Sequence, residues 1–262
     1  MLRSVLTKTL RDARRGFLWW SLGLVVLVLI SVAFWPSVRD NEGFKRFERD
    51  APEALKAFTG GNLDFTSPAG YLDARLFALV VPLLFLVYAV GWGARAVAGE
   101  EEAGTLELVL AHPVSRSRLL LEKLGALTLQ LATLGVVLLV TVVVSAKAVS
   151  MDISSARIAD AVLAVSLLAL LYGTLALAVG AATGRRATAI GVAAALAVAG
   201  YFLNGLAQVV DALDPWRVLS PFDWVGDPLR EGLGAGVIAL ALGALLVAAA
   251  AVPLFNRRDV GV

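Results

Sequence analysis

Six long runs without a charged residue constrain this sequence more than any other feature. Each run has 19 to 25 residues, and together they take up 138 of the 262 residues. About 20 apolar helical residues span the roughly 30 Å hydrocarbon core of a bilayer, and lipid favours helices because their backbone hydrogen bonds are internal. The short alternating segments of a membrane β-barrel are not seen. The sequence therefore predicts an all-α integral membrane protein with six transmembrane helices, at about residues 16–38, 75–97, 120–146, 159–184, 187–210 and 232–256.

Composition supports this fold class and excludes several kinds of chemistry. The chain is 59% hydrophobic, against about 45–50% for a typical soluble domain, and its charged residues cluster between the six runs. We expect one transmembrane domain over residues 1–262. There is no cysteine and only one histidine, His112, which excludes thiolate and two-histidine zinc sites, so no metal site is predicted. No P-loop motif occurs, and no catalytic residues or cofactor are predicted on this chain.

Basic residues in the loops predict the orientation of the chain. With six spans both termini lie on one side of the membrane, and placing them in the cytosol puts thirteen Lys and Arg residues there. The two shorter outer loops then hold only four basic residues, and the long first loop counts for less in this comparison. The excess of positive charge on the cytosolic side therefore predicts that both termini are cytosolic.

The first fifteen residues have an amphipathic pattern. Leu2, Val5, Leu6, Leu10 and Ala13 fall on one helical face. The basic residues on the opposite face are Arg3, Lys8, Arg11, Arg14 and Arg15. We expect an interfacial helix over 1–15 whose cations meet anionic lipid headgroups. The alternative is a disordered basic flank that serves only as a topology signal.

Two segments on the predicted outer side are polar or aromatic rather than uniformly apolar. Residues 39–73 form a predicted outer loop, with a helix start at 50–53 and a stop at 60–61. Residues 211–231 combine three prolines with Trp216, Phe222 and Trp224, a pattern of the membrane–water interface. A short re-entrant or surface-lying hairpin and an ordinary interfacial loop both fit this segment.

The predicted spans carry no ionisable residue near their centres. Charged residues in spans usually mark proton or ion pathways, so their absence argues against a proton-coupled carrier. The interior polar set is mild and comprises Ser21, Thr133, Ser166, Thr174, Asn204 and Gln208. We therefore expect an apolar cavity and a hydrophobic or amphipathic substrate. Small-residue spacings such as Gly180-x-x-x-Gly184 and Gly232-x-x-x-Gly236 allow close helix packing, but they arise often by chance in an alanine-rich chain.

The segment between the second and third spans predicts a short surface helix. Glu100, Glu101 and Glu102 would each cost about 3 kcal/mol in hydrocarbon, so the span should end before them. Gly104 and Thr105 can start a helix over 106–111 that Pro113 stops. One face of this helix carries Leu106, Val109 and Leu110, and Glu107 lies opposite. After Pro113, Ser115 can cap the third span, and Arg116 can anchor that span at the headgroups. Taken alone, the three glutamates could be a solvated stop-transfer cap.

This segment resembles the signature of ABC type-2 transporter permeases, with Glu-x-x-Gly-Thr-Leu-Glu followed by Pro-x-Ser-Arg. The matching residues are Glu101, Gly104, Thr105, Leu106, Glu107, Pro113, Ser115 and Arg116. The resemblance covers most of the chain, although the loop 39–73 is longer than the minimal family pattern.

The resemblance implies a permease subunit of a bacterial cytoplasmic-membrane exporter. Its surface helix would be a coupling helix that docks on a separate P-loop ATPase, which would hold the ATP and Mg. Two ATPase subunits would work with a homodimer, or with a pair formed with a homologous permease. The alternative is a secondary carrier or a membrane scaffold protein without an ATPase partner.

Overall fold

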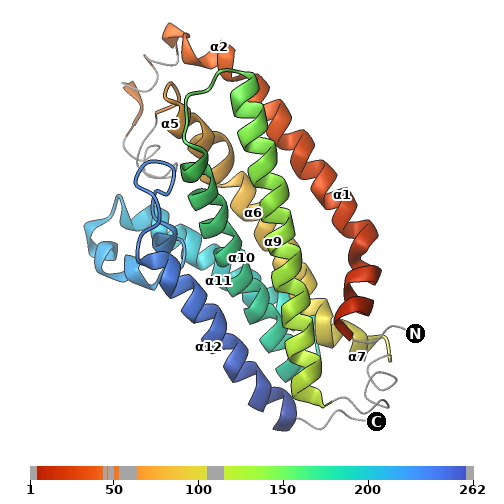
Figure 1. Cartoon of the computed structure of the whole chain (residues 1–262). Coiled ribbons are helices and arrows are strands. Elements are labelled where there is room, and N and C mark those ends of the chain that lie inside the picture. Colours follow the sequence, from red (N-terminus) through yellow and green to blue (C-terminus); the bar gives the residue numbers. More distant parts are fainter. Residues whose placement is uncertain (1–4, 44–45, 47–49, 53–63, 105–114, 258–262) are drawn as a thin grey trace.

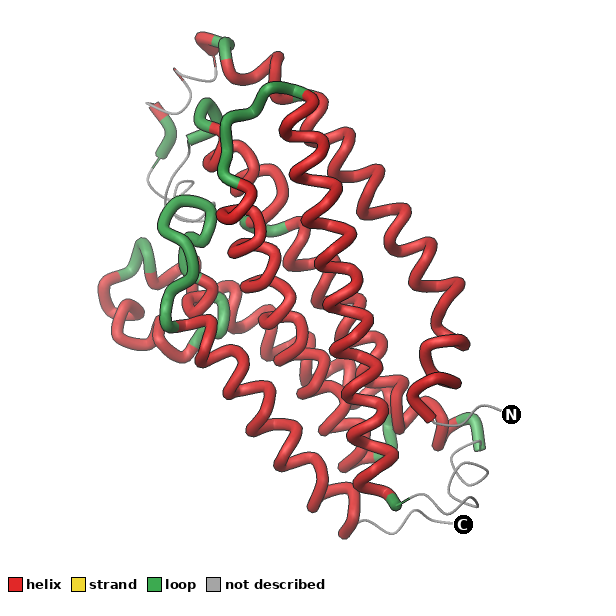
Figure 2. The backbone as a smooth tube through the Cα atoms, in the orientation of Figure 1, coloured by secondary structure: helices red, strands yellow, loops and turns green. Residues whose placement is uncertain are grey.

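In the computed structural model, the described residues are 5–43, 46, 50–52, 64–104 and 115–257, and these form helices and loops without strands (Figure 2). Six of the helical segments are long and apolar enough to cross a membrane, which confirms the predicted fold class. They run roughly side by side, and both ends of the described chain lie at the same end of the bundle (Figure 1). We call this the N-terminal end and the opposite one the far end.

The first membrane helix is longer than predicted at its start. Helix α1 (Val5–Ala33) runs without interruption through Gly16, so there is no boundary between an interfacial helix and the span; residues 1–4, with Leu2 and Arg3, lie outside the described residues. A single glycine costs only about 1 kcal/mol in a helix and does not end it. Val5 and Leu10 pack against the main core, so the apolar face of this segment contacts protein. Helix α2 (Trp35–Arg39) follows, with Pro36 in its first turn.

The second span also begins earlier than predicted, within the segment assigned to the outer loop. Helix α5 (Pro68–Leu72) is capped by Ser67, whose hydroxyl accepts a hydrogen bond from the Gly70 amide at 3.1 Å. A capping serine followed by proline is a strong helix start. The helical segment then continues as the π-helical turn η1 (Asp73–Phe77), α6 (Val80–Ala94), the π-helical turn η2 (Arg95–Gly99) and α7 (Glu100–Glu102). Of the predicted outer helix at 50–61, residues 53–61 lie outside the described residues.

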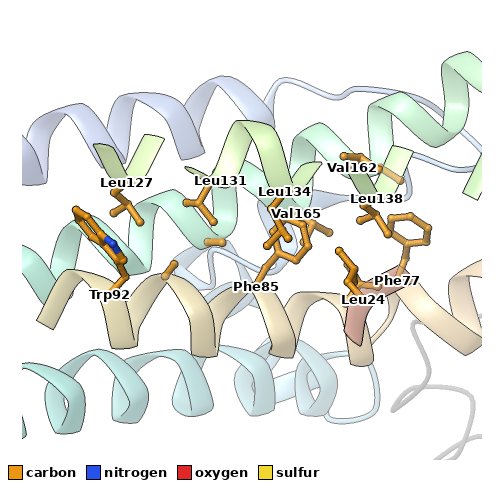
Figure 3. Close-up of a cluster of buried hydrophobic side chains, with 14 of the residues drawn as sticks. Leu24, Phe77, Phe85, Trp92, Leu127, Leu131, Leu134, Leu138, Val162 and Val165 are labelled. Carbon is orange, nitrogen blue, oxygen red and sulfur yellow. The ribbon is translucent and has the colours of Figure 1, made fainter. Parts of the chain in front are cut away.

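Four further long helices complete the bundle. They are α9 (Arg116–Ala148), α10 (Ser155–Thr183), α11 (Arg186–Ala207) and α12 (Gly236–Arg257). Helix α10 is the central one: it packs against α6, α9, α11 and α12, while α1 lies outermost and packs on α9 (Figure 1). Side chains from α1, η1, α6, α9 and α10 meet in the main core (Figure 3). A second cluster of buried hydrophobic side chains lies between α6, α10, α11 and α12.

Close approach of α6 and α10 depends on two facing glycines. A Cβ atom at Gly93 would lie 2.1 Å from the carbonyl oxygen of Gly173, and one at Gly173 would lie 2.9 Å from Ala89 Cβ. Small residues at such contacts let membrane helices pack by van der Waals contact, because lipid supplies no hydrophobic force between them. The Gly180-x-x-x-Gly184 spacing noted in the sequence does less: Gly180 makes only ordinary contacts, and Gly184 adopts a left-handed conformation that ends α10. In the second spacing, a Cβ atom at Gly236 would lie 2.2 Å from the carbonyl oxygen of Trp224, so this glycine allows α12 to start close to η4.

The segment between α11 and α12 is compact rather than extended. It contains the 3-10 helices η3 (Asp211–Leu219) and η4 (Asp223–Val225). Arg217 pairs with Asp223 at 2.6 Å, and the Trp224 indole donates to the Val218 carbonyl at 2.8 Å. Helices α11 and α12 are shorter than α1 and α9, so this hairpin lies closer to the middle of the bundle than α2 does (Figure 1). Its depth in the membrane stays a prediction.

Candidate functional site

The predicted coupling segment connects two helices at the N-terminal end of the bundle. The structure describes Glu101, Gly104, Ser115 and Arg116 of its signature. The other predicted residues, which are Thr105, Leu106, Glu107, Val109, Leu110 and Pro113, lie outside the described residues, and so does the predicted helix 106–111. The described residues on either side show how this segment is attached to the bundle.

A buried ion pair joins the end of the second span to α9. Lys123 of α9 is only 5% exposed, and its Nζ atom contacts Glu100 Oε1 of α7. A buried charge is costly unless it is paired, so the lysine and the glutamate hold each other in place. The pair therefore fixes α7 against α9 just before the undescribed segment 105–114.

The third glutamate of α7 contacts a different helix. The backbone amide of Arg186, the first residue of α11, donates a hydrogen bond of 2.8 Å to Glu102 Oε1. The first amides of a helix have no partner within the helix, and a carboxylate there also interacts favourably with the helix dipole. Glu102 therefore acts as a cap for α11, supplied from another part of the chain.

The chain leaves α7 through a turn that suits glycine. Gly104 has a φ of +64°, and its amide donates to the Glu101 carbonyl at 2.9 Å. A side chain is disfavoured at this φ, whereas glycine adopts it freely. The glycine of the signature therefore ends the helical segment of the second span and starts the connection.

On the other side of the connection, α9 begins at a side-chain cap. The Ser115 hydroxyl accepts a hydrogen bond of 3.3 Å from the Arg118 amide. Arg116 reaches α12, where its Nη1 donates to the Phe255 carbonyl at 3.4 Å and its guanidinium lies 5.8 Å from the centre of the Phe255 ring. The signature serine and arginine thus fix the start of α9 and join it to the end of α12.

Helix α1 is attached to the same region. Its Leu6 amide donates a hydrogen bond of 3.0 Å to Glu122 Oε2 of α9, and Arg118 Nε donates to Glu122 Oε1 at 2.9 Å. Of the predicted lipid-interface residues, Lys8, Arg11, Arg14 and Arg15 are exposed on α1, while Arg3 lies outside the described residues. The segment 105–114 is therefore flanked by contacts that reach α9, α11 and α12 directly and α1 through α9.

A second feature is an apolar groove between α6 and α11. It has a volume of about 420 Å³, and apart from Tyr201 it is lined by apolar side chains and glycine. Leu83 and Val87 of α6 face Val198 and Phe202 of α11, and all four side chains are about half exposed. Phe222 of the hairpin also lines it. The apolar cavity expected from the sequence stays a prediction, and this groove is a candidate for it.

Several of these contacts were not predicted from the sequence. Lys123 was only one of the thirteen basic residues counted on the cytosolic side, and nothing indicated that Glu102 caps α11 or that Arg116 reaches Phe255. A lysine close to the start of an otherwise apolar span, together with three consecutive glutamates at the end of another, is a signal that could have suggested the ion pair. The Arg116–Phe255 contact has no such signal, because the two residues are 139 positions apart.

The six long apolar helices of the bundle define a multi-pass membrane protein. The chain belongs to the ABC-2 family: the family model described as "ABC-2 family transporter protein" matches residues 3–214. The match includes α1 to α11, residues 105–114 and the start of the hairpin. Members of this family are membrane components of transporters and are not themselves catalytic. No curated protein matches the chain.

Proposed function

We propose that this chain is the membrane-spanning permease subunit of an exporter driven by ATP that a separate P-loop ATPase hydrolyses. The ATPase would hold the ATP and Mg, and it would dock on residues 105–111. Membership of the ABC-2 family and the absence of a P-loop motif from the sequence support this division of labour. The basic residues of α1 and of the α10–α11 connection favour a cytosolic location for this end of the bundle.

The attachment of the segment 105–114 is the observation that carries the proposal. An ATPase that pushes on this segment would move α7 and the start of α9 together, because Lys123 joins Glu100 to α9. Glu102 would carry the displacement to α11, and Arg116 would carry it to α12. A motion at one surface can reach several membrane helices only through such contiguous contacts.

We further propose that the working exporter contains two permease chains, identical or homologous, and two ATPase subunits. Six spans are half of the usual exporter set. The bilayer in question is expected to be a bacterial cytoplasmic membrane. The half-exposed apolar groove between α6 and α11 supports a hydrophobic or amphipathic substrate, because a polar solute would find few hydrogen-bonding partners there.

The test is the double substitution Leu106→Ala with Leu110→Ala. Burying one leucine fully contributes about 1.5–3 kcal/mol, so truncating two at a docking surface should weaken ATPase binding by orders of magnitude. Co-purification with the ATPase and ATP-dependent transport in vesicles should both be lost, while expression and membrane insertion should be retained.

The matched control is Arg39→Ala. Arg39 lies in α2 at the far end of the bundle and makes an exposed ion pair with Asp40 at 3.0 Å (Figure 1). Exposed pairs contribute little, so this variant should bind and transport normally. If the double variant retains normal ATPase binding and transport, residues 105–111 are only a linker and the docking proposal fails.

A further inference from the structure

Between α1 and α6 lies a cleft that the proposed ATPase coupling does not use. Its volume is about 550 Å³, and its lining includes residues of the first turns of α1 and of η2, which lie towards the N-terminal end of the bundle. It exists because α1 packs on α9 along its length and meets the second span mainly near the far end, at η1. Towards its N-terminus the α1 backbone therefore lies apart from α6, and the two helices meet only through large side chains. The size is in the range of ligand sites, which is roughly 300–1,000 Å³.

The inner wall of the cleft is aromatic. Phe17 and Trp20 of α1 face Tyr88 of α6, with ring centres 6.3 and 5.6 Å apart respectively, and Trp92 lies one turn further along α6. The Tyr88 hydroxyl is oriented by a hydrogen bond to Gln130 Oε1 of α9. This wall offers apolar surface with few polar groups, as an acyl chain requires.

The mouth of the cleft is basic. Lys8 of α1, Arg95 of η2 and Arg186 of α11 all line it. Among the described residues, none of these three side chains has a carboxylate within 4.0 Å, whereas the fourth cation, Lys123, is paired with Glu100. Asp12 is the other carboxylate in the lining. Three cations from three helical segments therefore line one cleft, and they outnumber its unpaired carboxylate.

We propose that this cleft binds an anionic phospholipid from the leaflet at the N-terminal end of the bundle. Its phosphate lies among Lys8, Arg95 and Arg186, and an acyl chain lies along the aromatic wall. A lipid suits the cleft better than a soluble anion because the flanking surface is apolar: Trp19 on α1 and Val87 on α6 are both more than half exposed. The bound lipid bridges α1 to α6 on the N-terminal side of the ring contacts that Phe17 and Trp20 make with Tyr88. This proposal does not depend on an ATPase partner.

The test uses the purified chain in a mild detergent and native mass spectrometry. The probes are a phosphatidylglycerol and a phosphatidylcholine with identical acyl chains. The wild-type chain should retain one phosphatidylglycerol per chain at least tenfold more tightly than the phosphatidylcholine. Equal retention of the two lipids would overturn the proposal.

Two variants locate the binding to this cleft. Gly16 lines the cleft, and a Cβ atom there meets nothing within 4 Å, so Gly16→Leu should fill the space without disturbing α1 and should abolish the tight binding. Gly23→Leu is the matched control, because Gly23 also has open space around its Cβ position but does not line the cleft. If Gly16→Leu binds the lipid as Gly23→Leu does, the lipid is merely on the outer surface and the proposal is wrong.

The charged mouth is tested separately, so the proposal stays falsifiable if Gly16→Leu does not fold. Arg95→Gln with Arg186→Gln should reduce the preference for phosphatidylglycerol about fivefold for each cation. The control is Arg185→Gln, since this neighbouring arginine is exposed and outside the lining. Glycerol phosphate should not displace the lipid. Displacement at equal concentration would show a site for soluble phosphates and would refute the lipid assignment, as would an unchanged preference in the double variant.

Discussion

The ion pair between Glu100 and Lys123 gives an asymmetric prediction about stability. The lysine side chain is 6% exposed, whereas the glutamate side chain is 24% exposed. Glu100→Leu therefore leaves an almost fully buried ammonium group without its partner, which should cost about 3 kcal/mol of unfolding free energy. Lys123→Met leaves Glu100, whose side chain is partly exposed although its Oε2 atom is buried, and the cost should be smaller, about 1–2 kcal/mol.

The double variant Glu100→Leu with Lys123→Met completes the cycle. Replacing both members of a buried pair by apolar residues of similar size is often neutral, so the double variant should be close to the wild type in stability. A loss of about 3 kcal/mol corresponds to roughly 6–12 °C in melting temperature for a domain of this size. Thermal unfolding in detergent, followed by the fluorescence of the six tryptophans, measures all four proteins.

Two results would contradict this reasoning. If Lys123→Met is as unstable as Glu100→Leu, the difference in burial does not set the cost. If the double variant is as unstable as Glu100→Leu, the loss comes from packing rather than from an unpaired charge. A stable double variant should nevertheless transport poorly when its ATPase is present, because α7 is no longer tied to α9 by charge.

Two further predictions concern packing and the outer hairpin. Gly93→Leu should prevent α6 and α10 from assembling, because its Cβ atom would lie 2.1 Å from a backbone carbonyl of Gly173; detergent-stable yield should fall sharply, while Gly23→Leu should express normally. Ser220→Ala removes a fully buried hydroxyl that donates to the Gly200 carbonyl at 2.7 Å, which should cost about 1–3 kcal/mol and speed proteolysis of the hairpin. A hairpin cut at the wild-type rate would show that this hydrogen bond does not hold it.

The sequence by itself determined the class of fold. Charge-free runs of about 20 residues are a local property, and because a charged group is costly in hydrocarbon, six such runs predict six spans. Capping is local as well: Ser115 was predicted as the cap of the third span, and it is one in the structure. Ser67 followed by Pro68 carries the same kind of signal, and reading it would have placed the start of α5 correctly.

Only the tertiary structure decided which faces of these helices meet. Lipid is as apolar as leucine, so hydropathy cannot distinguish a side chain that faces another helix from one that faces the bilayer. The contact of Gly93 with Gly173 and the pairing of Lys123 with Glu100 join residues far apart in the sequence, and no local pattern encodes them. The same holds for α1, whose basic start was predicted as an interfacial helix over residues 1–15 and is continuous with the first span in the structure. Its path was decided by packing on α9, and that packing also opens the cleft beside α6.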